Sequence, residues 1–176
     1  MIRAVIFTIL VVTSINSYAQ NGFPDSWVGN YAGALEIFGK NDVRMQVNMK
    51  LEIQPKTDSL YTWHLIYEMN GNADKRMYEL KVIDKEEGHY LIDEKNTILI
   101  DGYYHLDRFT SMFEVMGSYI VTSYTKKVDT LIFEIIAGSM KEPRISGGQE
   151  FEGNKIPEVK AYLVNGRQKA VLKKIN

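Results

Sequence analysis

Apolar and polar residues alternate along much of the chain from residue 43 onward. From Val43 to Ile53 every odd position is apolar and every even position is polar or charged. Leu60 to Met69 repeats this period, with aromatic or apolar residues at each odd position. Because side chains of a β-strand point alternately to its two faces, both stretches are predicted to be strands with one buried face. Pro55 and Asp58 lie between them and predict a turn.

Further strands follow at short intervals. They are predicted over residues 76–83, 90–93, 97–106, 109–115, 119–125, 131–137 and 159–174. Gly117-Ser118 predicts a tight turn or a bulge, and Asn165-Gly166 predicts a hairpin or a bulge inside the last strand region. No stretch shows a period of 3.6 residues. Nine or ten strands joined by short turns predict an all-β protein, either an up-and-down barrel or a sandwich.

One long segment, Gly138 to Pro157, interrupts this pattern. It contains Pro143, Gly147-Gly148 and Gly153, residues that are typical of loops. We predict a long loop here, and two interpretations stay open. It is either a plain connector or a flap over the mouth of a cavity, because long loops in compact domains often act as lids.

The N-terminus has the three parts of a cleavable signal peptide. Arg3 supplies a positive charge, Ala4 to Val12 is almost entirely apolar, and Ser17 and Ala19 occupy the −3 and −1 positions of a cut after Ala19. The apolar run is shorter than the roughly 20 residues that span a bilayer. We therefore predict a signal peptide over 1–19 and one mature domain over 20–176, the alternative being a buried N-terminal strand or helix.

The composition of the chain limits where the protein can be located and what it can bind. The chain has no cysteine, which excludes a lipid anchor, disulfides and thiolate metal sites. No later segment is long and apolar enough for a membrane helix. The predicted mature protein is therefore soluble and either periplasmic or extracellular. The formal charge of −1 becomes −2 once Arg3 is removed. This near-neutral balance argues against binding to nucleic acid, and it gives no reason to expect attraction to anionic membranes.

A short motif suggests a family. Trp27-Val28-Gly29-Asn30-Tyr31 resembles the aromatic-x-Gly-x-Trp signature of lipocalins and fatty-acid-binding proteins, the calycin group. The resemblance implies a single up-and-down antiparallel barrel of about 8–10 strands. It also implies that the aromatic ring at the last motif position, here Tyr31, plugs the closed end beneath a basic residue of the last strand, Arg167 or Lys169. The chain is also similar to small exported lipocalin-like proteins of the Bacteroidetes type.

The sequence offers no catalytic, metal or cofactor site. His64, His89 and His105 lack the spacing of a local metal pair. The motifs of serine hydrolases, phosphate loops, dinucleotide sites and zinc peptidases do not occur. An enzyme on this barrel would need one of the histidines to face inward beside a carboxylate.

The best candidates for binding are the aromatic residues on one face of the predicted strands. In a barrel one face of each strand lines the interior. The predicted cavity-lining residues are Tyr61, Trp63, Tyr67, Tyr78, Phe109 and Phe113. They predict an interior site for a small apolar or aromatic molecule. Alternatively, these rings fill the interior, and the protein is a non-catalytic interaction module that binds another envelope protein.

Overall fold

The structure is a computed structural model that describes residues 22–176, and the predicted signal peptide lies outside the described residues. A short 3-10 helix, η1 (Asp25–Trp27), precedes the strands. The strands are β1 (Gly29–Phe38), β2 (Val43–Ile53), β3 (Pro55–Thr57), β4 (Leu60–Met69), β5 (Asn72–Asp84), β6 (His89–Asp93), β7 (Leu99–His105), β8 (Arg108–Val115), β9 (Ser118–Lys127), β10 (Thr130–Ser146), β11 (Glu150–Phe151), β12 (Asn154–Lys155) and β13 (Val159–Ile175).

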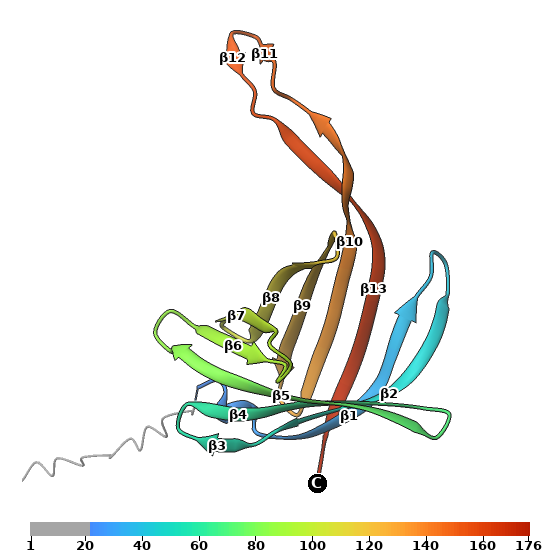
Figure 1. Cartoon of the computed structure of the whole chain (residues 1–176), viewed down its shortest axis with the longest axis vertical. Helices are drawn as coiled ribbons and strands as arrows, with labels where there is room; N and C mark the ends of the chain where they lie inside the picture. Colours follow the sequence, from blue (N-terminus) through green and yellow to red (C-terminus); the bar gives the residue numbers. More distant parts are fainter. Residues whose placement is uncertain (1–21) are drawn as a thin grey trace, which may run out of the picture.

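Ten of these strands close into an antiparallel barrel (Figure 1). Each pairs with its neighbour in the order β1-β2-β4-β5-β6-β7-β8-β9-β10-β13, and β13 pairs back onto β1. The predicted all-β, up-and-down antiparallel barrel is confirmed. It is the arrangement that the resemblance to lipocalins implies. The alternative prediction of a sandwich is wrong, because a sandwich would leave the edges at β2 and β4 open, whereas these two strands pair with each other.

The alternating pattern predicts the strands and their faces because the barrel has one dry and one wet side. β2 has the predicted bounds, and its odd residues Met49, Leu51 and Ile53 are fully buried. Val43 and Met45 share that face but are exposed. They lie where the β1–β2 hairpin projects past the body of the barrel (Figure 1). The alternation therefore identifies the inward face, whereas the depth of each residue follows from the fold.

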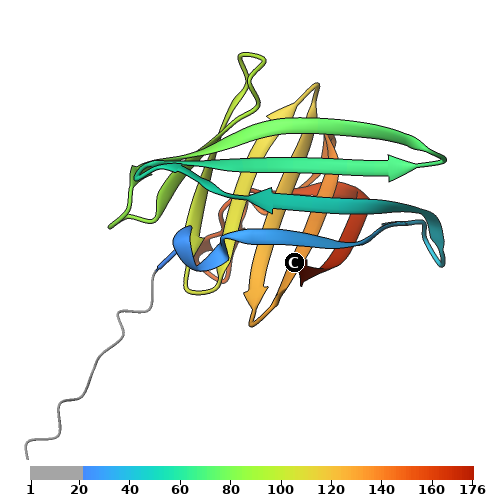
Figure 2. The ribbon, with the colours of Figure 1, turned by 90° about the horizontal axis from the view of Figure 1, so that it is seen from below.

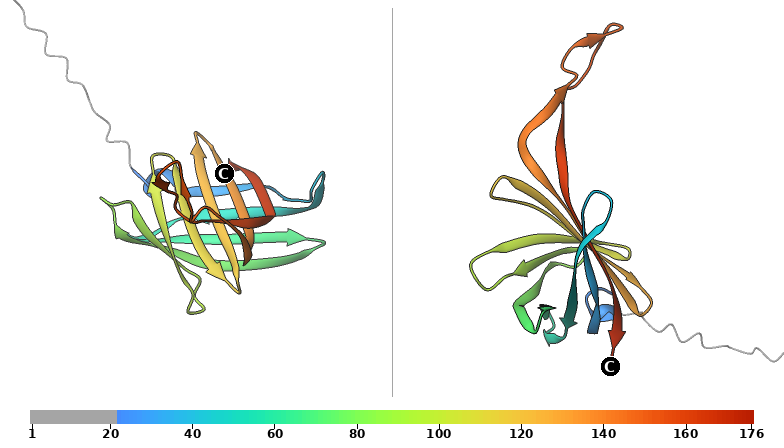
Figure 3. Two further views of the ribbon diagram at one scale, coloured as in Figure 1. Left: turned by 90° about the horizontal axis from the view of Figure 1, so that it is seen from above. Right: turned by 90° about the vertical axis from the view of Figure 1, so that its right-hand side faces the viewer.

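The predicted loop from Gly138 to Pro157 is wrong. β10 continues to Ser146, and β13 pairs with it as far out as Val159, so that the segment is a two-stranded ribbon that projects from the barrel (Figures 1 and 3). We call residues 140–165 the arm. Pro143 is accommodated where the register shifts between Ser139 and Arg144. At the predicted Asn165-Gly166 signal the register also shifts, which makes it a bulge within one continuous strand.

The two ends of the barrel differ. η1 and the C-terminus lie at one end, whereas the arm leaves from the other end (Figures 1 and 2). Phe23, which precedes η1, and Trp27, the last residue of η1, belong to the buried core. The end beside η1 is therefore closed by side chains, and a cavity can exist only toward the opposite end.

Candidate functional site

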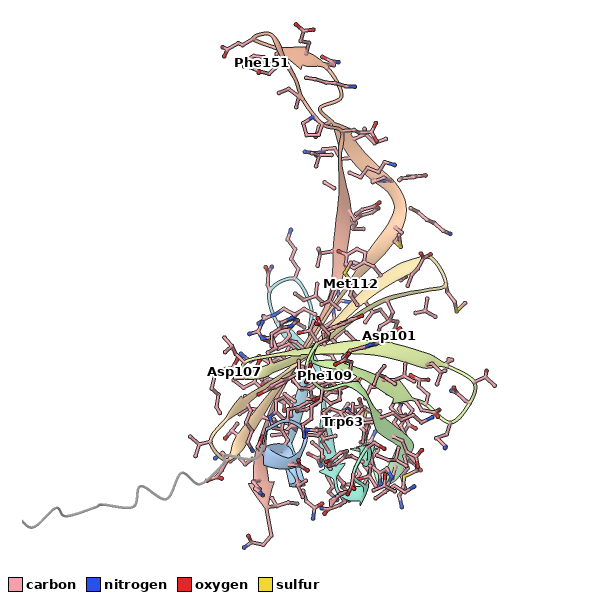
Figure 4. All side chains as sticks on the ribbon, turned by 90° about the vertical axis from the view of Figure 1, so that its left-hand side faces the viewer. Trp63, Asp101, Asp107, Phe109, Met112 and Phe151 are labelled. Carbon is pink, nitrogen blue, oxygen red and sulfur yellow. The ribbon has the colours of Figure 1, made fainter. Side chains whose placement is uncertain are left out.

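An aromatic cluster closes the barrel beside η1. Phe23 is the centre of the cluster: its ring centroid lies 4.8 Å from that of Trp27, 4.7 Å from that of Tyr90 and 5.3 Å from that of Phe109. Trp63 lies beyond, 5.6 Å from Phe109. Edge-to-face and offset contacts of this kind add to the gain from burying the rings. Figure 4 shows Trp63 and Phe109 among the side chains inside the barrel.

Tyr31 is fully buried at this end, and its cationic partner differs from the predicted one. Lys126 on β9 lies over its ring, 4.7 Å from the centroid, and donates a hydrogen bond of 2.7 Å to its hydroxyl. Arg167 instead covers the ring of Phe38, and Lys169 lies 3.9 Å from Glu134. The predicted pairing is wrong because Arg167 and Lys169 point outward on β13, whereas Lys126 shares the inward face of its strand with Tyr124.

Tyrosine hydroxyl groups at the closed end bond to protein atoms. Tyr31 donates to the carbonyl of Trp27 at 2.9 Å, and Tyr90 donates to the carbonyl of Phe23 at 3.0 Å. Burial, followed by the charge of Asp129, raises the pKa of Tyr31 to about 12. These bonds tie the segment around η1 to the barrel. The hydroxyl groups there need no ligand or water as a partner.

Above the cluster the interior contains a cavity of about 250 Å³. Most of its wall is aromatic or aliphatic, with a few polar groups. The lining residues are Trp63, Leu65, Tyr67, Arg76, Tyr78, Ile92, Glu94, Ile100, Phe109, Ser111, Phe113, Ile120, Thr122, Tyr124, Phe133 and Ile135. The barrel is thus filled at one end and hollow toward the other.

Five of the six aromatic residues predicted to line the interior surround this cavity. They are Trp63, Tyr67, Tyr78, Phe109 and Phe113. Tyr61 is also buried but lies nearer the closed end, where its hydroxyl donates a 2.5 Å hydrogen bond to Asp25 of η1. It is the first inward residue of β4, two positions before Trp63, and therefore anchors η1 instead of lining the cavity.

The sequence prediction missed the polar residues of the wall. Arg76 and Glu94 are its two charged members, and Ser111 and Thr122 contribute hydroxyl groups opposite each other on β8 and β9. A signal for Arg76 was present, because it precedes Tyr78 by two positions and so shares the face of Tyr78, Leu80 and Val82. Glu94 ends the inward series of Tyr90 and Ile92 in the same way.

Arg76 lies over an aromatic ring of the wall. Its guanidinium carbon is 4.9 Å from the centroid of Tyr67, and its Nε and one Nη each lie 3.1 Å from a carboxylate oxygen of Asp74. The side chains of Arg76 and Asp74 are about half exposed, which places them at the mouth and makes their ion pair a weak contributor to stability.

The tyrosines of the wall remain protonated at neutral pH. Burial raises the pKa of Tyr67 to about 12, and Arg76 partly offsets this rise. Burial, with the neighbouring carboxylate of Glu94, also raises the pKa of Tyr78. Burial raises the pKa of Tyr124 most. Each of the three hydroxyl groups therefore retains its proton, and that of Tyr78 is hydrogen-bonded to Glu94.

The three histidines point away from the cavity. His64 alternates with Trp63 and Leu65 on β4 and lies 3.6 Å from Glu52 on the outer face. His89 contacts Asp101 at 2.6 Å and stacks on Tyr103, also outside. His105 is exposed at the end of β7. None of them supplies the inward acid or base that a histidine-dependent enzyme on this barrel requires.

No protein-family profile matches the chain, and no curated protein sequence matches it significantly. Among residues 22–176, no helix has the length and apolar character needed to cross a membrane. Within the same residues no group of three or more histidines or carboxylates is placed to hold a metal ion.

Proposed function

We propose that the protein is an exported, lipocalin-like barrel that binds one small apolar or aromatic molecule in the cavity above Trp63. The observation that carries the proposal is the cavity itself, about 250 Å³ of space walled by aromatic and aliphatic side chains. Side chains of this kind usually fill a protein interior to crystal-like density. A mostly apolar space with a few polar groups, which the protein's own side chains leave unfilled, is typical of a site for a small ligand.

The size of the cavity limits the ligand. A cavity of about 150 Å³ lined by aliphatic and aromatic groups holds benzene, and pockets for drug-sized ligands measure about 300–1,000 Å³. At about 250 Å³, the interior suits a molecule of one or two rings or a short aliphatic chain. A longer chain would extend through the mouth, past Arg76.

The charges of the wall favour an uncharged ligand. Arg76 and Glu94 have opposite signs, so the wall carries no net charge. A buried ion without a partner is costly. The hydroxyl groups of Tyr67 and Tyr78, together with Ser111 and Thr122, can instead satisfy one or two polar atoms of a neutral molecule and fix its orientation.

Two alternatives are less well supported. An interaction module with a side-chain-filled barrel requires a solid interior, which the cavity above Trp63 does not provide. A histidine-dependent enzyme requires an inward histidine, and His64, His89 and His105 lie on the outside. The lipocalin relationship rests on the Trp27–Tyr31 motif together with the barrel topology, and export rests on residues 1–19. Export is tested by mass spectrometry of the mature protein, which we expect to begin at Gln20.

Ligand binding is tested with 2-naphthol, a neutral two-ring probe. We expect the wild-type protein to bind one equivalent, and Ile120→Trp to abolish binding because Ile120 lines the cavity and a larger ring fills it. Val121→Trp is the matched control, since Val121 lies on the outer face of the same strand. The anion 2-naphthoate should bind more weakly than 2-naphthol. Equal binding by wild type and Ile120→Trp, or no binding by wild type, would contradict the proposal.

A further inference from the structure

Among residues 22–176, no other element of the chain packs on the arm. Pairing of β9 with β10 ends at Ser139, and pairing of β1 with β13 extends only to Gln168, so that the outer parts of β10 and β13 pair with each other alone. Figure 3 shows this ribbon standing clear of the barrel, and Figure 4 labels Phe151 at its far end. A two-stranded ribbon is marginally stable by itself in water.

Large apolar side chains cover the arm. Seven of them are between 36% and 64% exposed: Ile145, Phe151, Ile156, Val159, Tyr162, Leu163 and Val164. Apolar residues grouped on one projecting element are unusual for a monomer and mark an interaction site. The number of exposed apolar groups therefore indicates that another surface covers the arm.

The two edges of the arm are not equivalent. The β10 edge carries Pro143 among the charged residues Lys141, Glu142 and Arg144, features that block strand addition. The β13 edge, Val159 to Val164, has no proline or glycine and one charged residue, Lys160. A segment with this composition readily adds another strand. The β13 edge is therefore the one open to pairing.

The charges of the arm and of the barrel indicate which molecule supplies the strand that pairs with the β13 edge. Residues 147–158, the outer half of the arm, carry three acidic side chains and one basic side chain, net −2: Glu150, Glu152, Lys155 and Glu158. A notch between the β1–β2 hairpin and the base of the arm is lined by Lys40, Arg44 and Arg167. With Asp42 in the same hairpin, this region has a net charge of +2. The same chain thus carries an acidic surface on its arm and a basic notch of opposite net charge.

We propose that the arm joins two copies of this chain into a two-fold symmetric dimer. The Val159–Val164 edges of both copies pair antiparallel, over about 20 Å of strand. In that arrangement the acidic outer half of each arm continues along β13 of the other copy and reaches its basic notch. A two-fold axis requires the same patch on both partners to be self-complementary, and this condition is met.

The test measures the dimer dissociation constant of the mature protein by analytical ultracentrifugation. Glu150→Lys/Glu152→Lys and Lys40→Glu/Arg44→Glu should each weaken the dimer about tenfold or more, because each places like charges together. The fourfold variant exchanges the charges between arm and notch and should restore most of the affinity. Glu86→Lys/Glu87→Lys, in the exposed turn before β6, is the control and should leave the constant unchanged.

All substitutions are at exposed positions, and near-ultraviolet circular dichroism checks that the barrel is intact. A monomer at the highest soluble concentration would overturn the proposal. A dimer that neither charge reversal weakens would overturn it as well, as would a fourfold variant no stronger than the double variants. A monomer whose arm captures a different envelope protein would assign the arm to that partner instead.

Discussion

Tyr31 combines several interactions that separate residues would otherwise have to make. It is fully buried, its hydroxyl bonds both to the carbonyl of Trp27 and to Lys126, and the Lys126 ammonium lies over its ring. Burial, together with repulsion from Lys174, lowers the pKa of Lys126. The motif predicted the position of Tyr31 and a basic partner on the last strand, whereas the partner is Lys126 on β9, because residues 95 positions apart meet only through the barrel's register.

At the residue scale, Tyr31→Phe should destabilise the protein by about 1–3 kcal/mol, measured by urea unfolding. The substitution keeps the ring but removes the hydroxyl that satisfies the Trp27 carbonyl and Lys126. Tyr103→Phe is a suitable control, since Tyr103 is exposed on the outer face, and its effect should lie within about 0.5 kcal/mol of zero. Equal effects of the two substitutions would show that these bonds do not stabilise the closed end.

At the element scale, most strands could be predicted because each has one dry and one wet face. The sequence of β2 alternates along the whole strand, but only the part with Met49, Leu51 and Ile53 has a dry face, whereas Val43 and Met45 are exposed. The outer part of β13 lies in the predicted strand region 159–174, but the ribbon that it forms with β10 could not be predicted, because both strands are exposed on both faces there and Gly147-Gly148 resembles an ordinary loop signal. The short strand β3 also lay hidden in the predicted turn. An ion-pair cluster attaches β3 to β5. Glu79 of β5 forms an ion pair with Lys56 of β3 and a second one with Lys95, at 3.0 Å.

Glu79 should make the free energy of unfolding depend on pH under acidic conditions. The hydrogen bond from Lys56, followed by that from Lys95, lowers the pKa of Glu79 below its ordinary value of 4.5. Because the folded-state pKa is the lower one, the contribution is complete above about pH 4.5 and is lost as the pH falls through the folded value.

The comparison is wild type against Glu79→Gln, by urea unfolding at several pH values. Glu79→Gln should be less stable than wild type near neutral pH, and the difference should shrink as the pH falls below 4.5. Glu68→Gln, which breaks the exposed pair with Lys50, should have little effect at any pH. A constant difference between wild type and Glu79→Gln across the range would contradict this role.

At the scale of the whole molecule, closure of the barrel makes separate amphipathic strands enclose one cavity. The inward faces of β4, β5 and β8 were predicted, and five of their aromatic residues meet around one space. The space itself was not predictable, since it depends on how closely 16 side chains from across the barrel approach one another. The sequence therefore left both a filled and a hollow interior open, and the packing above Trp63 leaves a space of about 250 Å³.

The most direct test of the account is native mass spectrometry of the protein purified from its producing cells without denaturation. We expect wild type and Val121→Trp to carry one equivalent of a small neutral molecule that is released on unfolding, and Ile120→Trp to carry none. A bound molecule retained by Ile120→Trp would place the site outside the cavity. Wild-type protein that carries no such molecule would contradict the claim that the interior is a binding site.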